Sequence, residues 1–514
     1  MSQINQPNVS VAILPANVAV PNASQQVLFI GQKNGGSAIA GALIQNILND
    51  HAEESLFGAN SQLAAMIRDA RKVNQVTQFD AIGIDDNGSG VDATGNVTVT
   101  GTATENGELL VTIGSEANHT YSIAVLDTQT ATAIGAAIAA AINADTKAPV
   151  TAVNTAGDVE LTAVNAGTLG NGITLKIAGT VAGVSVALVA MSGGLTDPVL
   201  TSVFDAIGSK RYQTIVWPYA NTAVVRTLLD ARFNVNNKLQ DGVAVTAQTD
   251  TLGNLLSTLN ALNSQSIVYL CDKTTSTDTQ KGAAQVELPY SKAAQFAAVR
   301  SLRLTDGADI SDIVISANGS LDAFGGSALA SKPYFNSNMA FLPLFDVGLG
   351  FNELEAEQLL TAGGSVIGNN SANNGVVLGE IVTTYKTDTA GNPDISFKFL
   401  NYVDTASQAR EYFFNNLKKR FAQSRLTEGD VQRGRDMAND VVISGFLNGL
   451  YSTLSGADFV LTQAGENALQ FFKANKTVTL DMATGTATVS MKTPIVTQLR
   501  NIFATMQLAF TVGG

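Results

Sequence analysis

The sequence predicts a multidomain protein of mixed α/β and α+β class. We expect a split α/β core with an inserted, mostly β domain, a C-terminal α+β domain, and a separate strand at each terminus. Three observations predict this fold. A βαβ rhythm runs on both sides of a segment of different composition, Gly95–Gly194. Long helical patterns and a hairpin signature follow in the last third. A length of 514 residues is also too great for one compact core.

The core begins with Val27–Ile30, a short continuous apolar run that predicts a buried strand. Apolar residues at helical spacing predict helices at Ser37–Asn49 and Leu63–Val73, and Phe79–Ile84 predicts a second strand. After Pro198 the rhythm resumes. Strands are predicted at Gln213–Trp217, Gly242–Ala247 and Ser266–Leu270, and the helices between them are predicted at Asn221–Val235 and Thr251–Leu262. We therefore expect parallel strands with helical crossovers, divided between residues 22–92 and 197–350. Residues 275–350 show no regular pattern.

The intervening residues 93–196 are expected to form the inserted domain. Between Gly95 and Gly194 there are two Lys, no Arg and seven acidic residues, while Thr, Val, Ala, Asn and Gly dominate. Short strand patterns fill this segment, with one Ala-rich helix at Ala131–Ala144. Gly clusters on both sides are typical of hinges.

Residues 351–495 are expected to form the C-terminal domain. Helices are predicted at Glu353–Leu360, Thr405–Gln423, Val431–Thr453 and Thr462–Asn475, and one strand is predicted at Val376–Tyr385. Apolar residues then alternate on both sides of Thr484-Gly485, which is the signature of a β-hairpin.

Each terminus carries a lone strand pattern, in residues 1–21 and 496–514. The alternating apolar positions are Val9, Val11, Ile13, Ile502, Ala504, Met506, Leu508 and Phe510. A strand isolated at a terminus is unstable by itself, so we expect these two segments to add to other sheets as arms.

Charge argues against one class of partner, and the length of the apolar runs argues against another. Lys and Arg number 30 against 43 Asp and Glu, which gives a net charge of −13 with only 14% of residues charged. A nucleic-acid-binding protein needs a basic footprint, so we expect no direct nucleic-acid contact. No uncharged apolar run reaches the roughly 18–20 residues of a membrane helix, and Met1–Pro21 lacks the features of a signal peptide. We expect no membrane partner and folding in a cytoplasm.

The sequence matches no complete catalytic or metal-binding pattern. The single cysteine, Cys271, lies in an apolar run and is expected to be buried, while His51 and His119 are expected to be solvated. These residues cannot supply a zinc ligand set or a triad. Asp85–Gly90 resembles the start of a calcium loop, but Asn96 occupies the position of the bidentate Glu. We expect no catalytic residue, no metal and no cofactor, although paired carboxylates remain open.

A basic stretch interrupts this acidic chain between Arg410 and Arg435, with seven basic residues against three acidic ones. One interpretation is a solvated helix face. The other is a concentrated basic surface for an acidic protein partner.

Several motifs in residues 350–514 occur in an order that resembles the tail sheath proteins of contractile-tailed phages, in particular the Mu-like group. The motifs are Glu357-Gln358-Leu359-Leu360 with Gly363, Val382-Thr383-Thr384-Tyr385-Lys386-Thr387, the helix Tyr412–Arg425, and Val496-Thr497-Gln498-Leu499-Arg500 before an alternating strand. The extended arm leading into Val27–Gln32 is similar too. Residues 275–350 are longer and more polar than the pattern of this family.

The resemblance implies a structural subunit of a contractile tail sheath, not an enzyme. Such subunits polymerise helically around a tail tube, in six-fold rings, and contraction drives the tube through the host envelope. Neighbours exchange N- and C-terminal strands, and inserted domains face outward. Implied partners are further copies, the tail tube protein, and baseplate and tail terminator proteins. Implied localisation is the virion tail, assembled in the bacterial host cytoplasm. The basic segment expected to face the tube comprises Lys418, Lys419, Arg420, Arg425, Arg433 and Arg435.

Three alternatives remain open at this point. The chain could be the sheath of a tail-like bacteriocin or another contractile injection system. It could be an α/β enzyme with a β accessory domain, which would need a pocket of converging polar groups. It could also be a surface adhesin with the inserted domain as its binding module.

Overall fold

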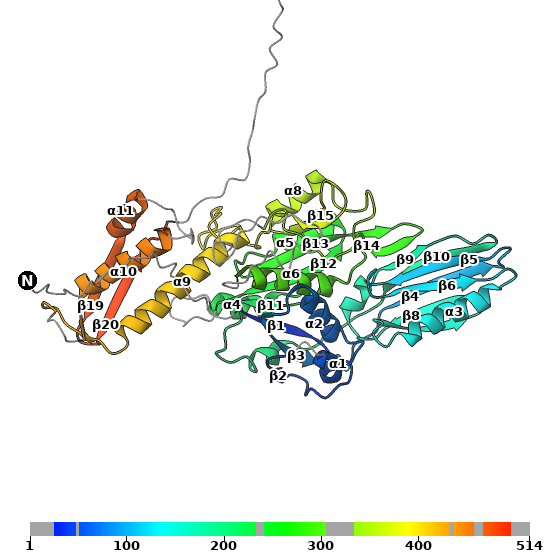
Figure 1. Cartoon of the computed structure of the whole chain (residues 1–514), viewed down its shortest axis with the longest axis horizontal. Helices are drawn as coiled ribbons and strands as arrows, with labels where there is room; N and C mark the ends of the chain where they lie inside the picture. The colour runs from blue at the N-terminus through cyan, green and yellow to red at the C-terminus, as the bar shows by residue number, and fades with distance from the viewer. Residues whose placement is uncertain are drawn as a thin grey trace, which may run out of the picture.

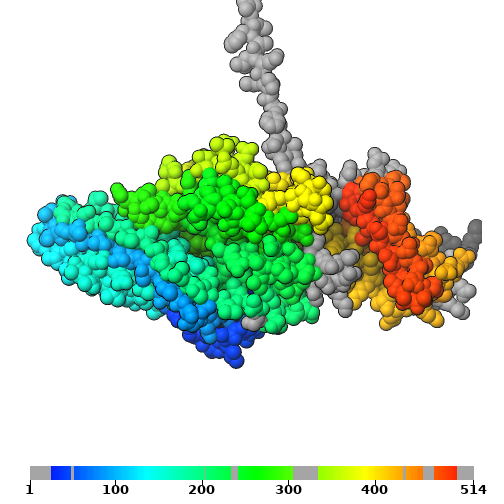
Figure 2. Space-filling model, turned by 180° about the vertical axis from the view of Figure 1, so that it is seen from behind, coloured from blue at the N-terminus to red at the C-terminus, as the bar shows by residue number. Residues whose placement is uncertain are grey.

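The computed structural model describes residues 25–47, 51–232, 241–304, 334–431, 436–456 and 466–494. Figure 1 shows an elongated molecule with the α/β core in the middle. The insertion (residues 94–192) lies at one end, and the C-terminal lobe (the described residues from 412 to 494) lies at the other. Figure 2 shows the lobe set apart from the rest of the molecule. Among the described ranges, no helix is long and apolar enough to cross a bilayer.

A parallel sheet forms the centre of the core. Its strands, in spatial order, are β3 (Gln78–Ile84), β1 (Gln26–Gln32), β11 (Thr214–Val216), β12 (Val243–Asp250) and β13 (Ile267–Ser276). Val27 and Phe29 are fully buried on one face, and Leu28 and Ile30 are fully buried on the other. Burial on both faces explains the continuous apolar run in the sequence. The prediction of a mixed α/β fold is confirmed.

Helices cover both faces of this sheet. The core helices are α1 (Ala52–Phe57), α2 (Gln62–Val73), α4 (Ala223–Arg232), α5 (Leu252–Asn260), α6 (Pro289–Leu304) and α8 (Glu353–Ala362). Residues of α2 and α6 share one apolar cluster with β1, while α4 belongs to the cluster on the opposite face. Helices α5 and α8 pack together over the end of the sheet beside Cys271.

The core sheet continues into the insertion. Twelve strands of the described chain form one hydrogen-bonded sheet. Its remaining members are β2 (Leu43–Ile44), β5 (Gly107–Ile113), β6 (Thr120–Val125), β9 (Leu175–Ala178), β14 (Gln280–Ala283), β15 (Ser365–Asn369) and β16 (Val376–Leu378). Strand β14 pairs with β13 on one side and with β9 of the insertion on the other. The insertion is therefore hydrogen-bonded to the core, and the domain boundaries given above stay predictions.

The insertion has a second sheet, of order β10-β4-β8-β7. Its strands are β4 (Thr94–Gly101), β7 (Val150–Thr155), β8 (Asp158–Ala163) and β10 (Val184–Ser192). Helix α3 (Ala131–Ala144) turns Ile134, Ile138 and Ile142 into the core, where all three are fully buried. Its exposed side carries mainly alanine, because only one stripe of the helix meets the sheets.

The C-terminal lobe joins the core through one long helix. Its elements are α9 (Leu400–Phe421), β17 (Arg425–Leu426), β18 (Met437–Ala438), α10 (Asp440–Gly456), α11 (Glu466–Ala474), β19 (Lys476–Asp481) and β20 (Thr486–Met491). The first half of α9 lies on the core, and its second half packs against α10 in a separate apolar cluster. The hairpin predicted around Thr484-Gly485 is present as β19–β20, and Gly485 has the positive φ of 66° that the turn requires.

Helix α6 falls in the stretch 275–350 that showed no pattern. All but one of its sixteen residues are buried, so no polar face marks a helical period. Its buried Lys292 and Arg300 look like surface residues in a sequence, but both form ion pairs inside the protein.

The helix predicted at Ser37–Asn49 is wrong for the described residues 37–47. The backbone turns at Gly36 and Gly41, whose φ values are 76° and 77°, and only the two-residue strand β2 follows. A Cβ at Gly36 would lie 2.3 Å from the carbonyl oxygen of Leu56. The backbone at Gly36 therefore packs closely against α1, and this contact prevents the helix that the spacing of apolar residues predicts.

Two further boundaries differ from expectation. The strand predicted at Val376–Tyr385 ends at Leu378, and the Gly379 amide then donates to the carbonyl of Val366 at 3.0 Å. The helix predicted from Val431 begins only at Asp440, after the short strand β18.

Candidate functional site

The junction between α6 and α9 holds a buried charge pair. Arg300 of α6 donates to the Asp404 carboxylate of α9 over 2.5 Å, and the Tyr334 hydroxyl donates to the other carboxylate oxygen over 2.6 Å. Arg300 also donates to the carbonyl of Gln213 at 2.6 Å, just before β11. The side chains of Arg300 and Asp404 are 4% and 0% exposed. This one guanidinium therefore joins the sheet, α6 and α9.

A second polar cluster fixes the next turns of α9. Arg211 pairs with Glu411 at 2.6 Å and with Asp241 at 3.3 Å. Ser407 donates to Asp241 over 2.7 Å, and Arg410 approaches the same carboxylate at 3.6 Å. Helix α9 is thus attached to the core along about two turns, from Asp404 to Glu411.

The far half of α9 holds the lobe through aromatic side chains. Phe413 stacks on Phe472 with ring centres 6.3 Å apart, and Tyr451 stacks on the same ring at 4.3 Å. Phe421 meets Phe446 edge to face. The lobe therefore packs against a helix whose first half is anchored in the core.

The basic segment lies at the end of α9. Lys418, Lys419 and Arg420 occupy its last turn, and all three are exposed. Arg425, also exposed, begins β17. Cations at a helix C-terminus are favourable because the helix dipole is negative there. The two remaining members of the segment, Arg433 and Arg435, lie outside the described residues. That this surface faces a tube stays a prediction.

The strand positions assigned to the arms, Val9 to Ile13 and Ile502 to Phe510, lie outside the described residues as well. The described chain begins at Gln25, which is buried, and the Gln26 amide donates to the Gln213 side chain at 3.0 Å. The first described residues therefore lie beside the Arg300 junction. At the other end, Lys492 to Pro494 follow directly after β20.

The hairpin β19–β20 is a sheet of two strands. Within the described ranges neither outer edge is paired. One face packs on the lobe through Val478, Leu480 and Val489. The other face is exposed and carries mainly Thr and Ser, which suit a strand. A two-stranded sheet is marginal by itself, and open edges are templates for another strand.

The family motifs at 363 and 382–387 have a structural role. Gly363 ends α8 with φ of 93°, and a Cβ there would lie 2.9 Å from the backbone of Thr384. The Thr384 amide donates to the carbonyl of Ile267 at 3.0 Å, and Lys386 donates to the carbonyl of Leu259 at 2.7 Å. These residues hold the chain after β16 against α5 and β13.

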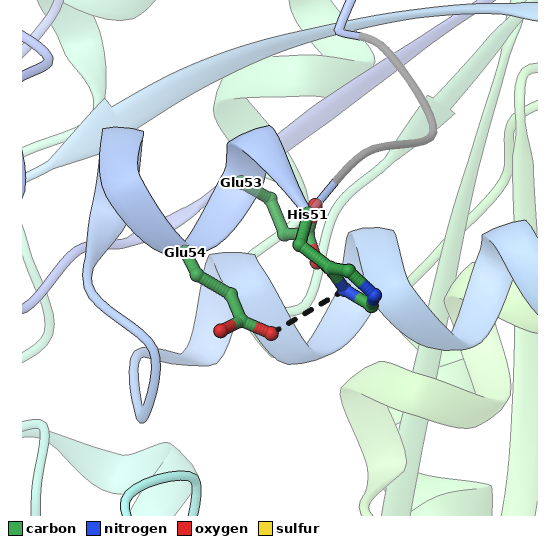
Figure 3. A group of neighbouring side chains, drawn as sticks. All are labelled: His51, Glu53 and Glu54. Atoms are coloured by element: carbon green, nitrogen blue, oxygen red, sulfur yellow. Dashed lines mark ion pairs between the residues drawn. The ribbon is translucent and has the colours of Figure 1, made fainter.

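A polar cavity of about 500 Å³ separates α2 from the turns of the insertion. His51 lies at its rim with Glu53 and Glu54, and their ligand atoms are within 4.8 Å of one another (Figure 3). Lys147 already pairs with Glu54 at 2.6 Å, and Arg68 lies 4.0 Å from the same oxygen. Because protein cations neutralise Glu54, we assign no metal to this group.

The two histidines differ in how far their side chains are exposed to solvent. His51 is exposed, as expected. The expectation that His119 is solvated is wrong: its side chain is 6% exposed, and Nδ1 lies 2.8 Å from Asp145. Burial lowers the pKa of His119, although the hydrogen bond to Asp145 opposes this effect. The loop that carries His119 folds onto α2, where Lys72 donates to Asn118 at 2.9 Å. That contact is long-range, so the sequence gives no sign of it.

Cys271 is buried, as the apolar pattern predicted. Burial raises the pKa of its thiol far above the ordinary range, so the sulfur stays protonated. A protonated thiol is neither a nucleophile nor a metal ligand.

Comparisons with known proteins find similar sequences and structures but no matching family model. No model of a protein family matches the chain. A curated relative, the Mu-like prophage FluMu tail sheath protein of Haemophilus influenzae, is 30% identical over 215 residues. The match covers 40% of this chain and 43% of the relative, so less than half of the relative's length is matched. The predicted resemblance to Mu-like tail sheath proteins is confirmed over that region.

Two solved structures are also similar. One is the sheath tail protein Lin1278 from Listeria innocua, with a TM-score of 0.46 and 11% identity, covering 93% of this chain and 94% of that chain. The other is the anti-feeding prophage helical sheath in its contracted state, with a TM-score of 0.45 and 10% identity, covering 99% of both chains.

The burial of His119 predicts a pH effect on stability. Burial lowers the pKa of His119 in the folded state, so the folded protein binds this proton less readily than the unfolded chain, whose histidine has the ordinary pKa of 6.5. Stability should therefore be retained above pH 6.5 and fall as the pH drops through it, by at most about 1.4 kcal/mol per pH unit. Urea unfolding at about pH 7.5 and about pH 5.5 measures the difference.

His119→Asn should remove this component of the pH dependence. His51→Asn is the matched control, because it removes an exposed histidine from the rim of the same cavity. Identical pH dependence in the wild type and His119→Asn would contradict the assignment.

Proposed function

We propose that this chain is the structural subunit of a contractile tail sheath. Copies polymerise helically around a tail tube in six-fold rings, and contraction drives the tube through the host envelope. The observation that carries the proposal is the 30% identity to a Mu-like tail sheath protein over 215 residues. The partners are further copies of the chain, the tail tube protein, and baseplate and tail terminator proteins. The virion tail is the location, after assembly in the bacterial cytoplasm.

Strand exchange through the arms is the proposed link between copies. The open edges of β19–β20 support it, because a strand from a neighbour can extend this sheet through main-chain hydrogen bonds. The alternating apolar residues of both arms suit a sheet with one buried face. An arm joined by strand pairing holds neighbours together while the bodies to which it is attached rotate.

The junction at Arg300 supports the mechanical part of the proposal. Buried ion pairs and aromatic stacking attach the lobe to the core through α9. A force on the lobe is therefore transmitted to the core. The energy source is conformational: an extended lattice of lower stability rearranges into one with more buried contact, and no nucleotide is needed.

A tail-like bacteriocin or another contractile injection system would use the same subunit chemistry and stays the alternative. The enzyme alternative is less favoured by the structure. The polar cavity of about 500 Å³ beside α2 is lined by groups that already pair with one another, as Lys72 does with Asp69 at 2.8 Å.

Deleting residues 2–14 tests the arm exchange. The truncated chain should fold, because the described core begins at Gln25, but it should remain monomeric. Sedimentation velocity compares it with the full chain, and circular dichroism checks that secondary structure is kept. Normal sheaths from the truncated chain would refute strand exchange through the N-terminal arm.

Charge reversal tests the tube-facing surface. Lys418→Glu, Lys419→Glu and Arg425→Glu together should impair extended assembly on purified tubes, because the proposal pairs this surface with an acidic tube. The loss should match that of wild type at high ionic strength, which screens the same attraction. Co-sedimentation with tubes is the measurement.

Lys473→Glu with Lys492→Glu is the control for this experiment. Both residues are exposed on the same lobe but lie outside the basic segment. If the triple variant assembles on tubes as well as this control does, the tube-facing role is wrong.

A further inference from the structure

Lys292, in the first turns of α6, is enclosed by the protein. Its Nζ contacts Oδ2 of Asp272 in β13 and also donates to the carbonyl of Gln285 at 3.3 Å. The two side chains are 2% and 4% exposed. An amine and a carboxyl group are therefore in contact where water has almost no access.

The surroundings solvate this pair poorly. The second carboxylate oxygen of Asp272 accepts one further hydrogen bond, from the Lys273 amide at 2.8 Å. Apolar neighbours, including Ala293 and Ala294, belong to the main core cluster. Two ions are costly in such a place. Condensation to an amide needs a neutral amine and a neutral acid, and one proton transfer from Nζ of Lys292 to Oδ2 of Asp272 across this contact would supply both.

A third buried group completes the set. Glu287 is 1% exposed, and its amide donates to the carbonyl of Gln285, the oxygen that Lys292 also contacts. Its carboxyl oxygens accept from Ser115 at 3.0 Å and from the Leu288 amide at 3.1 Å. Burial, and the nearby charge of Asp69, raise the pKa of Glu287 to about 8. Burial thus favours the protonated form of Glu287, and the charge of Lys292 is near enough to oppose that shift.

We propose that Lys292 and Asp272 are joined by an intramolecular isopeptide bond, with Glu287 as the proton relay for its formation. The proton of the Lys292 ammonium passes to the Asp272 carboxylate. The neutral Nζ then attacks the carboxyl carbon Cγ, and the N–C bond forms. Glu287 gives a proton to the departing hydroxyl and regains one from Nζ, so the C–O bond breaks and one water leaves. The sum is ammonium plus carboxylate giving amide plus water, with no oxidant or co-reactant.

The bond would join the central sheet to α6. Asp272 lies in β13 and Lys292 near the start of the helix that carries Arg300 at its other end. The remaining N–H of the amide keeps the carbonyl of Gln285 as its acceptor. The proposal stands on these side chains alone and does not depend on the sheath function.

Two other ion pairs serve as internal controls. Lys273 contacts Glu355 at 2.8 Å, with side chains 31% and 20% exposed, and Lys210 contacts Asp80 at 2.5 Å with its lysine 25% exposed. Water reaches these amines, so neither pair is enclosed as Lys292 and Asp272 are. We expect no bond at either pair.

Intact-mass spectrometry of the purified, denatured full chain is the test. The expected mass is lower than that of the sequence by one water, and tryptic digestion should give one branched peptide that joins Asp272 to an uncleaved Lys292. The control lysines, Lys273 and Lys210, should be cleaved normally. A full sequence mass with separate peptides would overturn the proposal.

Two variants test the roles within the set. Lys292→Arg keeps the positive charge but should restore the full mass. Glu287→Gln keeps the shape of the side chain but not its acid proton, and should leave most of the protein unbonded. Complete bond formation in Glu287→Gln would contradict the relay role of Glu287.

Discussion

The ion pair between Arg300 and Asp404 is the interaction on which the rest of the structure depends. It lies where the parallel sheet, the buried helix α6 and the long helix α9 meet. Removing one partner of such a pair leaves an uncompensated buried charge, which costs about 3–5 kcal/mol. That cost is a large fraction of the total stability of an ordinary domain. The pair thus constrains the start of α9, and through it the position of the whole C-terminal lobe.

This constraint explains how the surfaces considered for assembly are placed. The basic end of α9 and the hairpin β19–β20 both lie on the lobe, beyond the anchored half of the helix. The first described residues, Gln25 and Gln26, lie beside the same junction. The insertion occupies the opposite end of the molecule, and its sheet continues from the core through β14 (Figure 1). Surfaces far apart on the molecule are therefore connected by one continuous framework.

The sequence predicted the elements whose patterns are local. The hairpin could be predicted because Val478, Leu480 and Val489 alternate with polar residues, and the helix predicted at Glu353–Leu360 is present as α8. Helix α6 could not, because burial on every side removes the polar face that marks a helical period. The basic segment was visible as composition, and its four described members are exposed. The pairing of Arg300 with Asp404, and the burial of His119, depend on residues far away in the chain, which no local pattern reports.

Negative-stain electron microscopy of the purified full-length protein tests the sheath assignment most directly. If copies are joined by strand exchange as proposed, the protein should assemble without other components at high concentration. The sheath assignment predicts hollow tubes with regular striations. Discrete particles of the size of one chain, under all conditions of concentration and salt in which the protein remains folded, would contradict it.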